Sequence, residues 1–269
     1  MGNCCGSFRL SRKAKAQRLE GWARTGIVSL RDEKLKELPL SVVELGSKVT
    51  TLDATNNRLR NLPASIVDLA SLQRLNLAKN VLVEIPSVIG QLAQIKVLVL
   101  DFNQLSILPE SIGDLSRLEQ LSLSFNNLSN LPDSLGKLTM LKQLHIARNK
   151  LHALPDSIGD CSGLEEIEAT DNYLDEVPEA LGKLKKLKTL GLDNNRVANM
   201  PPAILVNCVA LQTLSLHSNP ITPEILESIE GWSDFEKRRQ TKTNKAIAGG
   251  AMLSQSAMDQ GVDRRTNQS

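Results

Sequence analysis

Residues 118–132, LEQLSLSFNNLSNLP, decide the fold. As a template they are Leu-x-x-Leu-x-Leu-x-x-Asn-x-Leu, followed by two residues and Leu-Pro. The template returns every 23 residues, and its last copy follows after 24. The repeated asparagines are Asn57, Asn80, Asn103, Asn126, Asn149, Asn172, Asn195 and Asn219. A fixed period of this length predicts a repeat architecture, because one unit cannot bury its own apolar face.

Each part of the template has a physical role. We expect the first three leucines to point inward from a short strand, with the polar residues between them on the opposite, concave side. The asparagine then bends the chain, and its side chain pairs with backbone groups of neighbouring coils that would otherwise be buried without partners. Pro132 is expected to open the convex segment as the first residue of a helical turn.

This template resembles the leucine-rich-repeat (LRR) signature. It predicts an α/β fold: a right-handed solenoid of about nine 23-residue repeats, with a parallel concave sheet and short 3-10 or helical convex segments. The first repeat is degenerate, with Glu33 in the asparagine position. We predict four parts. They are an acylated basic segment (1–24), the solenoid with its degenerate cap (25–221), C-terminal capping helices (222–245) and a disordered tail (246–269).

The convex segment Leu-Pro-x-Ser-Ile-Gly-x-Leu, seen at residues 108–115, resembles the intracellular Ras-group LRR proteins. These include the Ras-suppressor type, the scribble family and the plant intracellular Ras-group-related proteins. The resemblance implies a membrane-associated interaction protein, and by analogy a small-GTPase or kinase complex as the partner. Similar scaffolds bind different partners, so the resemblance does not name one.

Composition and charge narrow the class further. No run of about 18 apolar residues predicts a membrane-spanning helix, and no apolar segment near the N-terminus predicts a secretory signal. We therefore expect an intracellular chain. Residues 1–24 carry six Arg or Lys and one Glu, and residues 232–269 carry seven Arg or Lys and four acids, although the whole chain is only +2. Basic ends on an acidic body favour an anionic membrane surface over nucleic acid.

The N-terminus, MGNCCGS, predicts lipidation. After loss of the initiator Met, Gly2 offers an amine suited to myristoylation, and Cys4 and Cys5 lie where palmitoylation follows. The motif departs from the usual pattern, because Gly6 replaces the expected Ser or Thr. A single myristoyl chain binds membranes with only about 10⁴ M⁻¹, so a second signal is needed. We expect localisation to the cytoplasmic side of a membrane, most simply the plasma membrane, with a cytosolic pool.

The concave face carries the candidate binding site. The residue before each repeated asparagine is Phe102 in one repeat and Phe125 in the next, and Val97 and Val99 project from the strand nearby. Basic residues surround these side chains; they are Arg74, Lys79, Lys96, Lys142 and Arg148. An aromatic centre with an arginine rim is typical of protein-binding hot spots. The alternative is that both rings fold onto the scaffold and only shield the turn.

No residue pattern predicts catalysis. The acidic residues of one repeat, Glu165, Glu166, Glu168 and Asp171, could mimic a catalytic carboxylate pair, but Lys142 and Arg148 are expected to neutralise them. Cys161 and Cys208 fall at leucine positions and are expected to be buried apolar residues. We predict a monomeric, non-enzymatic adaptor or scaffold without cofactor, metal or nucleic acid. The alternative is a soluble LRR regulatory subunit that docks a phosphatase or a ubiquitin ligase.

Overall fold

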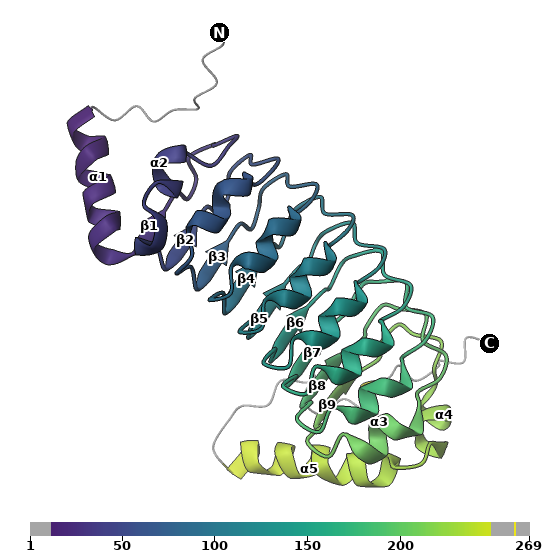
Figure 1. The fold of residues 1–269 in the computed structure, drawn as a ribbon. Helices are drawn as coiled ribbons and strands as arrows, with labels where there is room; N and C mark the ends of the chain where they lie inside the picture. Colours follow the sequence, from purple (N-terminus) through teal and green to yellow (C-terminus); the bar gives the residue numbers. More distant parts are fainter. Residues whose placement is uncertain (1–11, 249–260, 262–269) are drawn as a thin grey trace.

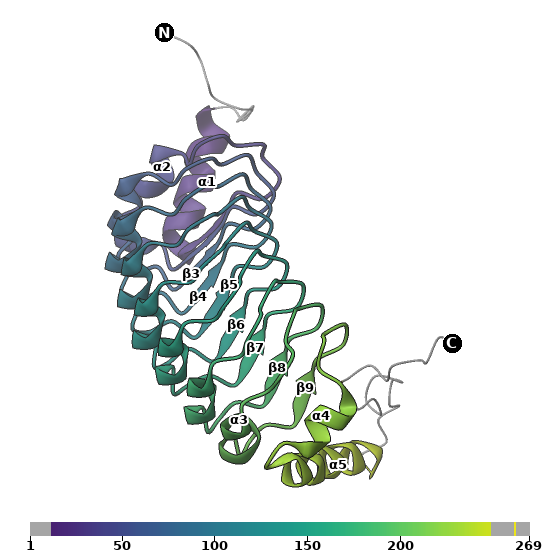
Figure 2. The ribbon, with the colours of Figure 1, turned by 90° about the vertical axis from the view of Figure 1, so that its right-hand side faces the viewer.

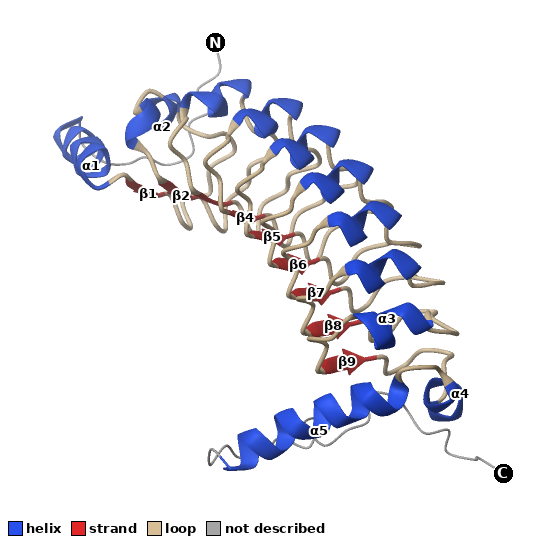
Figure 3. Cartoon of the chain, turned by 60° about the horizontal axis from the view of Figure 1, so that its bottom comes forward, coloured by secondary structure: helices blue, strands red, loops and turns tan. Residues whose placement is uncertain are grey.

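The computed structural model describes residues 12–248 and residue 261. In this part of the chain nine strands form one parallel sheet, in the order β1 to β9. Figure 1 shows the strands as successive rungs, and Figure 3 shows the strands along the inside of a curve with helical segments along its outside. The strands are β1 Ile27–Ser29, β2 Thr51–Asp53, β3 Arg74–Asn76, β4 Val97–Val99, β5 Gln120–Ser122, β6 Gln143–His145, β7 Glu166–Glu168, β8 Thr189–Gly191 and β9 Thr213–Ser215. The predicted parallel repeat solenoid is confirmed.

Each strand is three residues long, and its central residue is buried in the core. Leu121 of β5 is fully buried and pairs in register with Leu98 of β4 and Leu144 of β6. Leu118 and Leu123, on either side of the strand, are also fully buried. Buried residues from Trp22 to Phe235 form one continuous apolar cluster. Repetition of one inward pattern therefore produces a single elongated core.

The convex side is built mainly from 3-10 helices. They are η1 Gly46–Lys48, η2 Ala64–Asp68, η3 Ser87–Gln91, η4 Glu110–Asp114, η5 Asp133–Lys137, η6 Asp156–Asp160 and η7 Glu179–Lys183, with α2 Leu40–Val43 and α3 Pro202–Asn207 near the two ends. Pro132 was predicted to be the first helical residue, and this is wrong. Its ψ of 146° is extended, so it immediately precedes η5, and its carbonyl accepts the first hydrogen bond, from the Leu135 amide at 3.1 Å.

Neighbouring 3-10 helices pack through small residues. A Cβ atom added to Gly113 would overlap the backbone carbonyl of Ser134 in the next repeat. The hydroxyls of Ser111, Ser134 and Ser157 are buried at the same interface without a hydrogen-bond partner in the described residues. The Ser-x-Gly pair of the convex segment is therefore selected for its size, because it lets adjacent backbones approach closely.

Helices close both ends of the core. Helix α1 (Arg12–Thr25) lies beside β1 (Figure 1), and α4 (Pro223–Ser228) and α5 (Trp232–Ala248) lie beyond β9 (Figure 2). Trp22 of α1 and Phe235 of α5 are buried, and Trp232 packs against the core. Helix α1 was not predicted; it lies within the segment 1–24 that was expected to be acylated and basic, and extends one residue beyond it. Within residues 12–248 no helix is long and apolar enough to span a bilayer.

Candidate protein-binding surface

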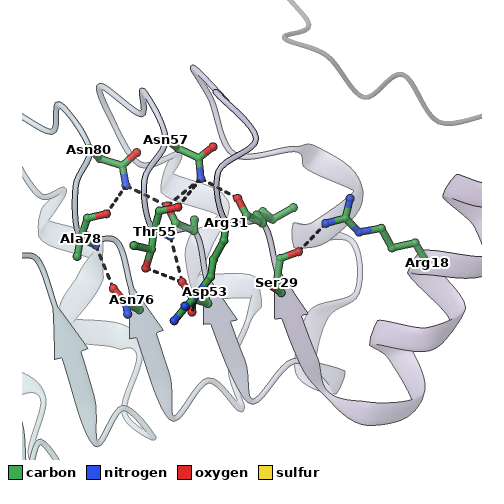
Figure 4. Close-up of polar contacts among 11 residues, drawn as sticks. Arg18, Ser29, Arg31, Asp53, Thr55, Asn57, Asn76, Ala78 and Asn80 are labelled. Carbon is green, nitrogen blue, oxygen red and sulfur yellow. Dashed lines mark hydrogen bonds and ion pairs between the residues drawn. The ribbon is translucent and has the colours of Figure 1, made fainter.

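The repeated asparagines hold the turns that follow the strands. The Asn126 side chain accepts a hydrogen bond from the Leu105 amide at 3.0 Å and donates to the carbonyls of Leu100 and Leu123 at 3.0 and 2.9 Å. Leu100 and Leu105 belong to the preceding repeat, so one amide joins two coils. Figure 4 shows the same arrangement around Asn57 and Asn80. This asparagine ladder positions the residue before each asparagine.

That preceding residue has a left-handed backbone in every repeat. Its φ lies between 53° and 59° at Asn56, Lys79, Phe102, Phe125, Arg148, Asp171, Asn194 and Ser218. Asn and Asp tolerate this region, whereas a bulky residue loses about 1 kcal/mol or more there. Two phenylalanines at successive positions are therefore not selected by the turn itself. Backbone strain at non-glycine residues is a reason to look for function at those residues.

The two phenylalanines stack on each other. Their ring centroids are 4.0 Å apart and their planes differ by 16°. The Arg148 guanidinium lies 4.8 Å from the Phe125 ring centroid, and the Lys79 ammonium lies 5.8 Å from the Phe102 ring centroid. Arg148 also binds the Asp171 carboxylate at 3.0 Å. We call Lys79, Phe102, Phe125, Arg148 and Asp171 the aromatic column, since they follow one another along five successive repeats.

The aromatic column remains open to a partner. Phe102 and Phe125 are 44% and 36% exposed, so neither ring is folded into the core. Their contact with each other covers a face of each ring, which leaves the ring edges and the flanking cations accessible. This arrangement combines apolar area with positive charge, as at many protein interfaces.

Val97 and Val99 occupy the outward positions of β4 and are half-buried. Their in-register neighbours on β3 and β5 are polar; these are Arg74, Asn76, Gln120 and Ser122. Val97 also lines a shallow hollow with Arg74, Lys96 and Glu119. The two valines are thus an apolar patch between the polar outward residues of β3 and β5.

Charged residues alternate along the start of the strands. Their pairing agrees with the prediction for Arg148, which binds Asp171 of the next repeat, and differs from it for Lys142. Lys142 was expected beside the acidic residues of the next repeat, but its ammonium binds Glu119 of the preceding repeat at 2.6 Å. Lys188 from the following repeat binds Glu165 at the same distance. The hydrogen bond from Lys142 lowers the pKa of Glu119. These exposed pairs contribute little to stability but leave this row nearly neutral.

Asp101 stabilises the turn that carries Phe125 by hydrogen bonds to the neighbouring repeat. Its carboxylate accepts hydrogen bonds from the Ser122 hydroxyl at 2.8 Å and from the Ser124 amide at 2.7 Å. Burial raises the pKa of Asp101, although these hydrogen bonds oppose the rise. Asp193 binds Ser215 and the His217 amide in the same way four repeats later. Asp101, which precedes Phe102, therefore fixes the end of β5 directly ahead of Phe125.

Strand β7 places two carboxylates, Glu166 and Glu168, on the outward face of the sheet, and the sequence did not predict how they pack. A Cβ atom at Gly191 would overlap the Glu168 carboxylate, so the missing side chain provides the space that Glu168 occupies. Burial, followed by the neighbouring Glu166 carboxylate, raises the pKa of Glu168. His145 lies 3.4 Å from Glu166. Gly191 could have indicated this space from the sequence, because the third residue of every other strand has a side chain.

Gly2, Cys4 and Cys5 lie outside the described residues. Cys161 and Cys208 are buried as predicted. Within the described chain no three His, Cys, Asp or Glu side chains come together as a metal site.

Comparisons with known proteins agree with the geometry. The family described as "Leucine-rich repeat region" matches residues 87–245, and the family described as "Leucine rich repeat" matches residues 47–105. The chain is 60% identical over 260 residues to plant intracellular Ras-group-related LRR protein 7 of Oryza sativa subsp. japonica, which covers 97% of this chain and 98% of that protein.

Solved structures show the same fold. An LRR protein of Leptospira interrogans superimposes with a TM-score of 0.74 at 35% identity, over 78% of this chain and 53% of that one. This chain thus spans about half the length of that protein. The plant peptide hormone receptor RGFR1, solved in complex with RGF2, matches with a TM-score of 0.62 at 32% identity, over 69% of this chain and 31% of the receptor.

The repeats and the fold define a leucine-rich-repeat protein, a class whose members are typically interaction modules. The similarity over nearly the full chain goes further: the protein belongs to the plant intracellular Ras-group-related LRR family. The MGN start and the Glu-Gly-Trp segment at residues 230–232 also suggest a likeness to leucine-rich repeat-containing protein 57. That likeness stays a prediction.

Proposed function

We propose that this protein is a non-enzymatic adaptor that binds a protein partner through the aromatic column and Val97 and Val99 on the concave face. The exposed Phe102–Phe125 stack carries the proposal, because two bulky rings occupy left-handed turn positions where an aromatic side chain gains nothing from the turn itself. Burial of each ring in a partner contributes about 2–3 kcal/mol. By family analogy, a small-GTPase or kinase complex is the partner class.

Partner capture tests this proposal. The intact chain, immobilised from its native cell, is compared with the double variant Phe102→Ser, Phe125→Ser. We expect the double variant to lose its specific partners and to keep its melting temperature, since neither ring belongs to the leucine core. Tyr173→Ser is the matched control, because Tyr173 is 42% exposed and also carries an arginine over its ring, from Arg196 at 4.8 Å. A double variant that keeps its partners refutes the proposed surface.

We further propose that acyl chains on Gly2 and on Cys4 or Cys5 hold the adaptor at the cytoplasmic face of a membrane. The basic residues of α1, which follow this segment directly, favour an anionic surface. Fractionation of cells expressing Gly2→Ala tests the tether: we expect the variant in the soluble fraction and the parent with membranes. Changing both cysteines to Ser should leave weak binding that salt removes, because the Debye length is about 8 Å at physiological salt.

A parent chain with an unmodified N-terminus in the soluble fraction would instead support the alternative, a soluble regulatory subunit. Mass spectrometry of the native N-terminus separates the two. The concave-face proposal does not depend on that outcome.

A further inference from the structure

The hydrogen-bond ladder between repeats continues at both ends of the sheet, where groups outside the repeats supply the missing partners. In each interior repeat, the buried apolar residue after the strand (Leu, Ile or Ala) donates its amide to the carbonyl of the last strand residue of the next repeat. Leu192, for example, donates to the Ser215 carbonyl at 2.8 Å, and Leu123 donates to the His145 carbonyl at 2.7 Å. Among the described residues no repeat precedes β1, and the carbonyl of its last residue, Ser29, accepts instead from the Arg18 guanidinium of α1 at 2.6 Å (Figure 4). The N-terminal edge is thus closed by a side chain.

At the other end, no repeat follows β9 in the part of the chain that the structure describes. Leu216 is the residue of β9's repeat that corresponds to Leu192, and its amide donates to the carbonyl of Gly261 at 2.7 Å. Gly261 is buried and lies 45 positions further along the chain. The Gly261 carbonyl therefore accepts the hydrogen bond that the last residue of a tenth strand would accept.

Only glycine fits at this position. Gly261 has a φ of 79°, a left-handed conformation that other residues rarely adopt. A Cβ atom at residue 261 would also overlap the Leu214 carbonyl oxygen, which belongs to β9. Two independent constraints, the backbone angle and the close approach, thus require the same residue.

The helical cap does not explain this contact. Helix α5 covers α3 and the turn before β9, because Arg238 donates to the carbonyls of Leu205 and Leu211 at 2.8 and 3.2 Å. These groups lie ahead of the strand, whereas Leu216 follows it. Leu216 is nevertheless fully buried. The β9 edge and the α5 cap are therefore separate closures.

We propose that the outer edge of β9 is a strand-binding site and that its occupant is this chain's own C-terminal segment, seated through Gly261. An exposed edge amide is a template for pairing with another chain, and an internal occupant blocks that pairing. This inference goes beyond the concave-face function and uses different residues.

The hydrogen bond can be observed directly in the full-length parent by NMR. We expect a nuclear Overhauser effect between the Leu216 amide proton and the Gly261 α protons, and slow amide exchange at Leu216. In the full-length variant Gly261→Val, Leu216 should exchange about tenfold faster, as expected for loss of one hydrogen bond. Leu192, which bonds within the solenoid, should be unchanged. Gly250→Val is the matched control, since it alters another glycine of the same C-terminal segment.

An excess of a synthetic peptide of residues 249–269 should restore slow exchange to the Gly261→Val chain, and the same peptide carrying Val at 261 should not. The proposal is overturned if the parent lacks the Leu216–Gly261 Overhauser effect. It is also overturned if Gly261→Val and Gly250→Val accelerate exchange equally, because the effect would then not depend on this glycine. Partner capture by the concave face should be the same in both variants, so failure here is distinguishable from failure of the adaptor function.

Discussion

Phe102 and Phe125 stack because the backbone brings their turns together. The amide of Asn103, which follows Phe102, donates to the Phe125 carbonyl at 3.2 Å, and both phenylalanines have left-handed backbones. Equivalent side chains therefore leave adjacent coils in parallel, and the rings meet at a centroid distance of 4.0 Å. The stack therefore depends on two turns whose left-handed backbone is unfavourable for phenylalanine.

The double variant Phe102→Asn, Phe125→Asn should be nearly as stable as the parent. Asn relieves about 1 kcal/mol of left-handed strain at each turn, and this offsets the loss of a ring–ring contact worth about 0.5–1.5 kcal/mol. Thermal unfolding monitored by circular dichroism measures the balance. A large fall in melting temperature would show that the rings belong to the scaffold.

Asn126→Ala should destabilise the fold by about 1–3 kcal/mol, because the Leu105 amide and the Leu100 and Leu123 carbonyls lose their buried partner. Urea unfolding measures the loss. Asn130→Ala is the control, since Asn130 is an exposed asparagine four residues later. Equal midpoints for the two variants would contradict the structural role of the ladder.

Two substitutions at one convex interface should have opposite effects. Gly113→Ala forces a methyl group onto the Ser134 carbonyl and should cost about 1–3 kcal/mol. Ser134→Ala removes a buried hydroxyl without a partner in the described residues and should be neutral or stabilising. The later repeats already carry Ala180 and Ala203 at the serine position. Parallel urea titrations test the pair, and a stable Gly113→Ala variant would refute the close packing.

The thiols of Cys161 and Cys208 should be unreactive in the native protein. Burial raises their pKa values to about 12 and about 11, and each thiol donates to a backbone carbonyl. The reactive thiolate is therefore scarce at pH 8. Titration of unacylated protein with a thiol reagent should count no more than two thiols before unfolding and four afterwards. Labelling of Cys161 or Cys208 in the native state would contradict this.

Glu168→Gln should stabilise the protein at neutral pH. The folded-state pKa of Glu168 is raised, so the native state holds this proton more tightly than the unfolded state does. The stability that protonated Glu168 contributes is present below its ordinary pKa of about 4.5 and is lost as pH rises through the folded value. The gain from Gln should therefore appear at pH 7 and vanish below pH 4.

Melting temperatures across this pH range test the sign. Glu165→Gln is the control, because the Lys188 hydrogen bond lowers the pKa of Glu165 and the substitution should not stabilise at pH 7. If Glu168→Gln destabilises at neutral pH, the carboxylate has a favourable partner and the assignment of burial as the main cause is wrong.

The sequence by itself determined the repeat, the inward residues and the outward row that contains Phe102 and Phe125. These follow from a period of 23 residues, because identical spacing places identical side chains in register on a parallel sheet. The expected burial of Cys161 and Cys208 followed from the same register. Helix α1 was not predicted, since its apolar positions are few and its packing depends on Trp22 reaching the first coil.

Only the tertiary structure decided which residues of the neighbouring repeats each polar side chain contacts. Lys142 binds Glu119 rather than the acids of the next repeat, and Glu168 occupies the space above Gly191. Both choices depend on rotamers and on distances between repeats, which a linear pattern does not encode. Gly261 is the extreme case: its contact with Leu216 spans 45 positions and breaks the period. A repeat specifies local, nearest-neighbour contacts, whereas closure of its last edge is a single long-range event.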